Sequence, residues 1–354
     1  DNSAMDGYAL RWEDLAAEGM TTLTVVADLP AGSRLERTMQ PGEAVRIMTG
    51  APIPPGCDCV VMQELVQRDG DRVTIPAGRS VNENIRPAGE DIRAGSMVLP
   101  KGNGLKPAQL GLLTALGLER VEVFRRPVVA LLSTGNEVIP AGMPLEPGQV
   151  YDSNRSALRA ALMALGVELL DLGVVRDHRE AIAAALARGG AEADAIITTG
   201  GVSVGDHDLV KEVLQGQGAI DFWQVAMKPG KPQAYGQLGR ARFFGLPGNP
   251  VSCLTVFLVM VRPALLRLMG RVEEPPKRMR ATFRGSLNKK HSRRDFIRGV
   301  AHFDAEGVWV ETTGHQGSGI LSSLAKANVL IILPEPPVKL ADGDDVTIQW
   351  IEYA

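Results

Sequence analysis

A stretch near the middle of the chain, AIITTGGVSVGDHDLVKEVL (residues 195–214), combines glycines with two carboxylates. An apolar, β-branched run ends in Gly200 and Gly201, and Asp206 and Asp208 follow before a pattern with helical spacing begins. Glycines let backbone amides approach a ligand closely, and the start of a helix offers unpaired N–H groups to an anion. Carboxylates beside such a turn suit a divalent cation bound to that anion. The alternative is a simple strand-to-helix turn in which Asp206 or Asp208 caps the helix.

Other polar turns follow apolar segments on either side of this stretch, and each contains a group that could bind an anion or a cation. They place Ser133, Thr134 and Glu137 in STGNEVIPAG, Asp177 in VVRDHRE, Lys228 and Lys231 in MKPGKPQAYG, and Asn249 between Pro247 and Pro250 in GLPGNPVS. Taken singly, each is explained as well by a helix cap, a turn former or a solvated charge. Taken together, the carboxylates suit a hard cation and the lysines offset phosphate charge, so we expect a metal-bound, phosphorylated ligand.

The order of apolar and polar segments predicts the elements that hold these turns. Between residues 126 and 274, short apolar strands alternate with helical patterns, which predicts an α/β domain with a doubly wound parallel sheet. In such sheets ligands bind beyond the carboxyl ends of the strands, where these turns fall. Short β-like runs predict a β-rich domain at 1–92, residues 93–125 form a connection with a helical pattern, and 275–354 predict a small C-terminal β-barrel.

Composition sets limits on the class of protein. The 354 residues exceed one ordinary core, and 45% hydrophobic with 22% charged residues are typical of a soluble globular protein. A net charge of −3 argues against a chain that coats nucleic acid. Three cysteines without a CxxC pattern indicate reduced thiols in the cytoplasm. The longest apolar run, VSCLTVFLVMV at 251–261, falls short of the roughly 18 residues of a membrane span and predicts a buried helix. We therefore expect a cytoplasmic protein without a membrane or nucleic-acid partner.

One segment departs from the nearly balanced charge of the chain. Residues 271–298 contain ten lysines and arginines against three acidic residues, a balance of +7. Few aromatic residues are interleaved with these charges, so steering of an anionic substrate explains them more simply than binding of nucleic acid. A solvated strand face is the alternative.

Nine short blocks extend over essentially the whole chain: DNSAMDGYA, RIMTGAPIP, NIRPAGEDI, STGNE, YDSN, TTGGVSVGDHD, KPGKP, GLPGNPVS and TTGHQGS. In residues and in order they resemble the MoeA family of molybdopterin molybdenumtransferases, which includes the E domain of gephyrin. The resemblance implies a MogA-like fold for the central domain. It also implies that molybdate is inserted into adenylylated molybdopterin with release of AMP, assisted by Mg²⁺ or, alternatively, by Zn²⁺.

Carried over position by position, the resemblance assigns roles to residues of these blocks. It implies catalytic roles for Asp208, Glu137, Asp177, Asp6 and Asp91, of which Asp208 and Glu137 would also bind the metal ion. The residues expected to bind substrate are Thr49, Thr134, Gly200, Gly201, Ser203, Lys228, Lys231, Pro247, Pro250, Arg298 and Ser318. Molybdate is a tetrahedral dianion, so Arg298 and Ser318 suit it as a cation and a hydroxyl donor. Asp6 and Asp91 lie far from the sheet in sequence, and turn capping is their alternative role.

The resemblance also implies a homodimer, in which residues 93–125 belong to an elongated dimerisation domain and the partner chain completes each cleft. The helical segment that usually precedes DNSAMDGYA in the family is not in this sequence, so we expect that N-terminal residues are missing and that dimer stability is affected. A MogA-like adenylyltransferase is a further expected partner. Two other functions stay open. One is a molybdopterin adenylyltransferase, which would lack the flanking β domains, and the other is a non-catalytic scaffold like gephyrin, for which no peptide groove is marked.

Overall fold

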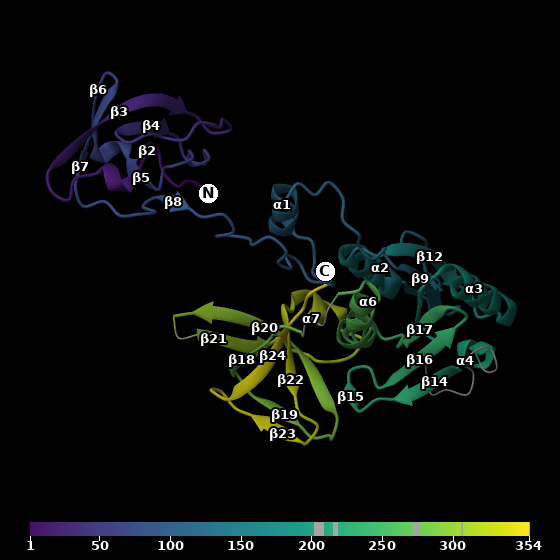
Figure 1. Cartoon of the computed structure of the whole chain (residues 1–354). Helices are drawn as coiled ribbons and strands as arrows, with labels where there is room; N and C mark the ends of the chain where they lie inside the picture. Colours follow the sequence, from purple (N-terminus) through teal and green to yellow (C-terminus); the bar gives the residue numbers. More distant parts are fainter. Residues whose placement is uncertain (202–208, 215–218, 272–275, 306, 354) are drawn as a thin grey trace. The chain divides into compact units, whose positions relative to one another are not determined.

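The computed structural model describes the chain except for residues 202–208, 215–218, 272–275, 306 and 354. The chain divides into two compact units, Asp1–Pro100 and Lys101–Ala354, which Figure 1 colours along the sequence. The first unit is built mainly from β-strands, and the second combines an α/β sheet with a β-barrel. Separate clusters of buried apolar side chains lie inside each unit, so each has its own core.

The first unit contains a six-stranded sheet with the order β5-β2-β4-β3-β7-β6. Its elements are β1 (Asn2–Ser3), β2 (Gly7–Leu10), η1 (Trp12–Asp14), β3 (Met20–Leu29), β4 (Glu43–Ile47), β5 (Cys59–Met62), η2 (Gln63–Leu65), β6 (Gln67–Asp69), β7 (Arg72–Pro76) and β8 (Ile85–Arg86). The β3–β4 pair is parallel and the other pairs of the sheet are antiparallel. Along β4, Val45 and Ile47 enter one apolar cluster and Ala44 enters another, so both faces of the sheet are covered. The predicted β-rich fold of this region is confirmed.

The second unit begins with a short helix, α1 (Pro107–Ala115). Pro107 occupies its first turn, where a missing N–H costs nothing, and Gly117 follows its end with a φ of +76°. The helical pattern in the sequence comes from the spacing of Leu110, Leu113 and Leu116, which predicts an apolar stripe. In the structure Leu113 is buried while Leu110 and Leu116 are 50% and 41% exposed. The helix is therefore where the sequence predicts it, but only part of its stripe is covered.

A six-stranded sheet with the order β12-β9-β13-β17-β16-β14 forms the centre of the second unit. Its strands are β9 (Val128–Thr134), β12 (Glu168–Val175), β13 (Ala195–Thr199), β14 (Ala219–Gln224), β16 (Pro232–Leu238) and β17 (Ala241–Leu246). The strands β12, β9, β13 and β17 are parallel, as the alternating pattern predicts. The strand β16 is antiparallel to both neighbours, because only short turns, rather than a crossover helix, connect it to the strands on either side.

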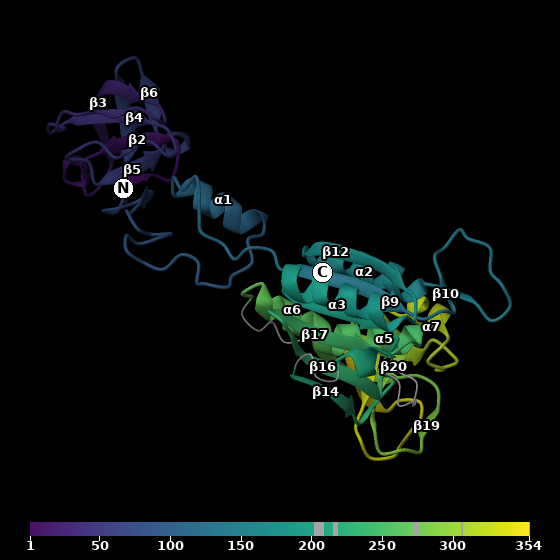
Figure 2. The ribbon, with the colours of Figure 1, turned by 90° about the vertical axis from the view of Figure 1, so that its right-hand side faces the viewer.

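Helices cover both faces of this sheet, as a doubly wound fold requires (Figure 2). Val129 and Leu131 of β9 pack with α2 (Ser153–Leu165) and the long apolar helix that begins at Pro250. The alternate residues Ala130 and Leu132 pack with α3 (Arg179–Glu192) and α4 (Leu209–Leu214). Side chains alternate between the two faces of a strand, so one continuous apolar run supplies both cores.

The long helix spans Pro250–Leu268 as α5 (Pro250–Val256), a π-helical segment (Phe257–Val261) and α6 (Arg262–Leu268). The helix has 19 residues, and an 18-residue window of it has a mean hydropathy of 1.8, which by length and composition is enough to cross a membrane. However, 61% of that window is buried inside the protein, including Phe257 and Val261. The helix belongs to the core of the second unit, which agrees with the buried helix that the sequence predicts.

The end of the chain forms a closed barrel (Figure 1). Its strands are β18 (Arg278–Phe283), β20 (Arg294–Asp304), β21 (Gly307–Thr312), β22 (Val329–Leu333) and β24 (Asp345–Trp350), and pairing of β20 with β22 closes it. A two-stranded antiparallel sheet of β19 (Leu287–Lys289) and β23 (Val338–Leu340) accompanies the barrel, and the sequence did not predict the short helix α7 (Leu321–Lys326). The strand β15 (Met227–Lys228) pairs with β20 and so ties the barrel to the α/β sheet.

All three cysteines are free, as their spacing predicts. Burial raises the pKa of each thiol, Cys57, Cys59 and Cys253, to about 12. A thiol with such a pKa is almost wholly protonated at neutral pH and is a poor nucleophile, so these residues contribute packing rather than chemistry.

Candidate functional site

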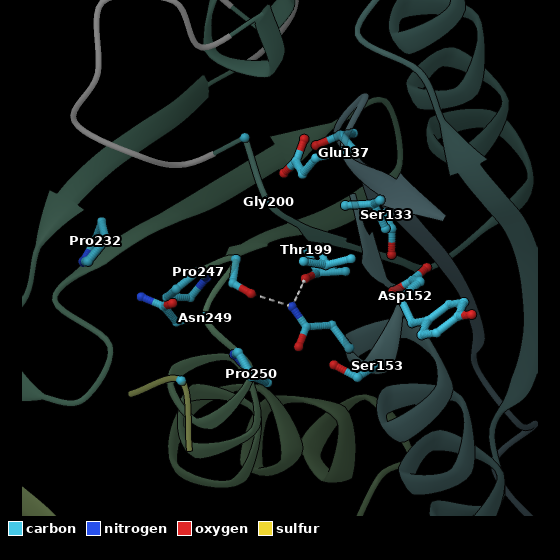
Figure 3. Close-up of a pocket in the computed structure, with 18 residues that line it drawn as sticks. Ser133, Glu137, Asp152, Ser153, Thr199, Gly200, Pro232, Pro247, Asn249 and Pro250 are labelled. Carbon is cyan, nitrogen blue, oxygen red and sulfur yellow. Dashed lines mark hydrogen bonds between the residues drawn. The ribbon is translucent and has the colours of Figure 1, made fainter. Parts of the chain in front are cut away.

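A cavity of about 680 Å³ lies at the carboxyl edge of the parallel strands (Figure 3). The turns that follow β9, β13 and β17 all reach it, because the ends of parallel strands lie on the same edge of a sheet. Its volume lies in the range of pockets for small-molecule and cofactor ligands. The lining residues are Ser133, Thr134, Glu137, Val138, Val150, Tyr151, Asp152, Ser153, Asn154, Thr199, Gly200, Gly201, Pro232, Pro247, Gly248, Asn249, Pro250 and Gly319.

The turn after β13 needs glycine at two consecutive positions. Gly200 and Gly201 have φ values of +89° and +68°, a region that favours glycine. A Cβ on Gly200 would lie 2.8 Å from the carbonyl oxygen of Thr134, and one on Gly201 would lie 2.3 Å from Cγ2 of Val210. Both glycines line the cavity, so the bare backbone that the sequence indicates does face it. Ser203, Asp206 and Asp208 lie outside the described residues.

The carboxylate of Glu137 lies at the cavity over Gly135. A Cβ on Gly135 would be only 2.7 Å from Oε2 of Glu137, so the missing side chain makes room for this carboxylate. The neighbouring Asn136 exchanges hydrogen bonds with Asp177, whose Oδ2 accepts from the Asn136 amide at 3.2 Å. In return the Asp177 amide donates to Oδ1 of Asn136 at 3.1 Å. Asp177 is not among the residues that line the cavity; it holds the turn that presents Glu137.

The described residues of the cavity suit Mg²⁺ better than Zn²⁺. The described residues contain no group of three or more His, Cys, Asp or Glu side chains placed to hold a metal ion. Zn²⁺ prefers nitrogen and sulfur ligands, and neither His nor Cys occurs among the described lining residues. Mg²⁺ needs only one or two carboxylates when phosphate and water complete its shell. Glu137 therefore suits Mg²⁺ held jointly by the protein and a phosphorylated ligand.

Asn154, which is not among the predicted site residues, links two strand ends at the floor of the cavity. The Nδ2 group of Asn154, at the start of α2, donates to Oγ1 of Thr199 and to the carbonyl oxygen of Gly248, both at 2.7 Å (Figure 3). Its Oδ1 is buried and has no hydrogen-bond partner among the described residues, and the same holds for Oγ of Ser133. The start of the helix is capped by Asp152, whose Oδ1 accepts from the Arg155 amide at 3.0 Å. The block YDSN was the available signal, a run of polar residues at a helix start.

The turn after β17 leads directly into the long helix. Pro247 and Pro250 line the cavity, and Figure 3 shows them across from Ser133 and Asp152. Asn249 is the N-cap residue, as the sequence predicts, but its side chain makes no capping hydrogen bond. An amide oxygen with no capping duty stays available to a ligand.

The two lysines of MKPGKPQAYG lie on the turn between β14 and β16. Lys228 and Lys231 are both exposed, and neither is among the residues that line the cavity, although Pro232 directly after Lys231 is. The peptide bond between Lys228 and Pro229 is cis, and Nε2 of Gln233 donates to the carbonyl oxygen of Gly230 at 2.8 Å. Of this segment only Pro232 lines the cavity, and Lys228 lies in β15, which pairs with the barrel strand β20.

Arg298 of the barrel is 1% exposed, and its guanidinium holds the loop that follows β21. Its Nε donates to Oγ of Ser323 and its Nη2 to the carbonyl oxygen of Gly317, both at 3.0 Å. Burial lowers the pKa of Arg298 to about 10, so it stays charged at neutral pH, and no carboxylate among the described residues pairs with it. The Val251 amide donates to the carbonyl oxygen of Ser318 at 3.1 Å, which fixes this loop at the start of α5. The loop thereby brings Gly319 to the cavity.

The remaining predicted residues belong to the first unit. Oδ1 of Asp6 accepts from the Thr49 amide at 2.7 Å and from the Thr49 hydroxyl at 2.8 Å. These bonds, that of the amide first, hold the pKa of Asp6 below its ordinary value. Asp91 is exposed. The geometry of Asp6 matches the turn-capping alternative, and the catalytic roles of Asp6 and Asp91 stay predictions.

The basic segment at 271–298 does not form one unbroken positive surface. Several of its cations pair with carboxylates of the C-terminal part: Lys277 with Glu352 at 2.7 Å, Arg280 with Asp345 at 3.1 Å, Arg284 with Asp304 at 3.5 Å and Arg294 with Glu335 at 3.6 Å. Lys289 is buried and donates to three backbone carbonyls. Much of the +7 balance is thus offset by acids from outside the segment, which weakens long-range steering of an anion.

Comparison with known proteins covers almost the whole chain. Three family models match it, the MoeA N-terminal region (domain I and II) at 1–117, a probable molybdopterin binding domain at 130–267 and the MoeA C-terminal region (domain IV) at 280–351. A molybdopterin molybdenumtransferase of Haemophilus influenzae is 41% identical over 99% of this chain and 87% of that protein. One from Nostoc is 38% identical over 98% of this chain and 82% of that protein.

A solved structure agrees with these relatives. The crystal structure of a molybdopterin biosynthesis MoeA protein from Pyrococcus horikoshii has a TM-score of 0.83 and 34% identity, covering 99% of this chain and 87% of that one. Sequence and fold therefore agree over nearly the full length. On this evidence, the chain belongs to the MoeA family of molybdopterin molybdenumtransferases.

Proposed function

We propose that this protein inserts molybdenum into adenylylated molybdopterin, with molybdate as the second substrate and AMP as the leaving product. The observation that carries the proposal is the cavity at the carboxyl edge of the sheet, which joins glycine turns, polar side chains and the Glu137 carboxylate in a chain of this family. The relatives bear the name of this transferase, which favours it over an adenylyltransferase or a scaffold without catalysis.

We assign the polar floor of the cavity to the phosphate groups of the adenylylated substrate. Ser153 and Asn154 lie at the start of α2, where backbone N–H groups favour negative charge. Ser133 and Thr134 add hydroxyl groups beside them. These groups would hold the phosphoanhydride that must break for AMP to leave, and fixed donors stabilise the charge that develops on its oxygens.

We assign Glu137, together with Asp208, to an Mg²⁺ ion that also binds the phosphates. Such an ion supplies charge stabilisation on the phosphate oxygens. In this assignment Asp177 does not touch substrate. Its hydrogen bonds with Asn136 keep the turn in the conformation that directs Glu137 to the cavity.

We assign the anionic second substrate to the rim formed by the lysine turn and the barrel loop. Molybdate needs cationic groups and hydrogen-bond donors, which Lys228, Lys231 and Ser318 offer. The Arg298 guanidinium is charged and has no carboxylate partner among the described residues, so its charge favours an anion at this loop while its N–H groups hold the loop carbonyls. Pro247 and Pro250 shape the opposite wall.

The test is molybdate-dependent release of AMP. Purified protein is mixed with adenylylated molybdopterin and Mg²⁺, with and without molybdate, and AMP is separated by chromatography. We expect AMP only when molybdate is present. Intact substrate under both conditions would contradict the proposal, and consumption of ATP with free molybdopterin would favour an adenylyltransferase instead.

We further propose that the protein acts as a cytoplasmic homodimer, supplied with substrate by a MogA-like adenylyltransferase, and that the first unit of one chain serves the cavity of the other. Mixing an Asp6→Ala variant with a Glu137→Gln variant tests this arrangement. If the first unit acts across the dimer, mixed dimers contain one intact site and regain activity that neither variant has alone. No recovery after confirmed subunit exchange would show that each chain serves itself.

A further inference from the structure

Tyr151 is the only aromatic residue among the described residues that line the cavity. The other lining residues are mostly small or polar, apart from Val138 and Val150 close to it. Its side chain belongs to β11 (Val150–Tyr151) and is 47% exposed. A ring that is neither packed into a core nor fully solvated, at the wall of a ligand cavity, has a free face to offer.

The backbone that carries Tyr151 is held in place. β11 pairs with β10 (Val138–Ile139), the Val150 amide donates to the Glu137 carbonyl oxygen at 2.8 Å, and the Asp152 amide donates to the Ile139 carbonyl oxygen at 2.9 Å. The tyrosine hydroxyl donates to the carbonyl oxygen of Met143 at 3.0 Å, within the loop that projects between the two strands (Figure 2). Both ends of the side chain are therefore anchored, and the ring keeps one orientation.

We propose that Tyr151 is the stacking surface for a flat nitrogen heterocycle of the substrate, with Val138 and Val150 as the apolar wall beside it. This inference deepens the proposed function and rests on it, because an adenylylated pterin carries two such rings. Stacking needs no hydrogen-bond pattern, so the ring would select for aromatic ligands without reading their edges. The cavity thereby divides into an apolar end at β10–β11 and a polar floor at Asn154 and Thr199 for phosphates.

The test compares ligands with and without an aromatic ring. Isothermal titration measures the dissociation constants of AMP, of ribose 5-phosphate and of 6-hydroxymethylpterin for the full chain and its variants. We expect Tyr151→Ala to weaken binding of at least one aromatic ligand on the order of tenfold, as loss of a stacked base does, and to leave ribose 5-phosphate unchanged. If the variant binds AMP more weakly, the tyrosine ring stacks on adenine. If it binds 6-hydroxymethylpterin more weakly, the ring stacks on the pterin.

Two further variants separate stacking from structural effects. Tyr151→Phe keeps the ring and loses only the bond to Met143, so we expect aromatic ligands to bind within about twofold of the unchanged protein. Tyr235→Ala removes a tyrosine of similar exposure, 50%, that does not line the cavity, and we expect no change in binding. Thermal unfolding checks that every variant is folded.

The inference is overturned if Tyr151→Ala binds both aromatic ligands as well as the unchanged protein does. It is also overturned if Tyr151→Phe loses as much affinity as Tyr151→Ala, because the hydroxyl would then act by holding the loop. These outcomes are separate from failure of the proposed function. Ring-dependent binding together with no molybdate-dependent AMP release would refute the transferase reaction and leave the stacking role intact.

Discussion

Two acidic turns in the two units show different uses of a carboxylate. In the first unit, one oxygen of Asp6 accepts two short hydrogen bonds from Thr49, so its charge is taken up within its own turn. In the second unit, the Glu137 carboxylate lies at a cavity above a glycine, and no hydrogen bond to it comes from the residues that the structure describes. Both residues belong to blocks typical of the family. Within one chain, the Asp6 carboxylate is therefore bound by its own turn, whereas the Glu137 carboxylate is available to a cation or a substrate.

The largest effect is expected at the open carboxylate. Glu137→Gln keeps the size of the side chain and removes its charge, so we expect kcat to fall roughly a hundredfold through lost electrostatic stabilisation. We expect the free energy of unfolding to stay within about 0.5 kcal/mol, because the side chain is exposed. Molybdate-dependent AMP release and denaturant unfolding measure the two quantities. The exposed Glu122→Gln is the matched control, and equal activity of both variants would remove Glu137 from the site.

A smaller effect is expected at Asp177, which acts through its neighbour. Asp177→Ala removes the acceptor for the Asn136 amide, so we expect roughly a tenfold loss of kcat as the turn beside Glu137 loosens. Asp177→Asn keeps an acceptor oxygen and should retain most of the activity. If kcat falls equally in both variants, the charge of Asp177 takes part directly in the reaction and the positioning role is wrong.

In Asn154 the Nδ2 group donates two hydrogen bonds, whereas Oδ1 has no hydrogen-bond partner among the described residues. Asn154→Ala leaves Thr199 and Gly248 without this donor, and we expect a loss of about 1 kcal/mol in the free energy of unfolding. Asn249→Ala is the control at the same cavity, because the Asn249 side chain makes no capping bond. Chemical denaturation of both variants provides the measurement, and an Asn154 variant as stable as the control would show that the link carries no stability.

The smallest effect is expected at Asp6, and it depends on pH. The pKa of Asp6 is lower in the folded chain than in the unfolded chain, so its stabilising contribution is present above the unfolded value, near 3.8, and is lost as pH falls through the folded value. Thr49→Val removes the hydroxyl donor and should move the pKa of Asp6 upward, toward its ordinary range. Carboxyl resonances followed by NMR titration report this shift. An unchanged Asp6 pKa in the variant would show that the hydroxyl bond does not contribute to the shift.

The sequence predicted those features of the site that depend on a few neighbouring residues. Gly200 and Gly201 occur where only glycine fits, so the bare turn after a strand was visible in the residues themselves. The predicted turns after β9, β12, β13 and β17 do lie at one edge, because parallel pairing follows from the alternation of strands and helices. The contact of Arg298 with molybdate stays a prediction, and the sequence did not reveal that its guanidinium also donates to the carbonyl oxygens of His315 and Gly317.

Other features of the site depend on partners that the sequence does not reveal. Asn154 is bound to Thr199 and Gly248, which are 45 and 94 residues away, so the block YDSN marks a polar helix start but not these partners. Tyr151 becomes a wall of the cavity only because the two-residue strands β10 and β11 pair. Helix α7 has six residues, too few for a helical period to stand out.

The sequence by itself determined which segments become strands, which turns lack side chains, and which family the chain resembles, because propensity, periodicity and glycine chemistry act over a few residues. Only the tertiary structure decided which carboxylates accept hydrogen bonds within the chain and which lie at the cavity. Whether a carboxylate accepts hydrogen bonds depends on donors that folding brings to it from distant positions, as it brings Thr49 to Asp6. It also decided that a loop of the barrel reaches the cavity, because the pairing of β15 with β20 and the bond from Val251 to Ser318 join the barrel to the α/β layer.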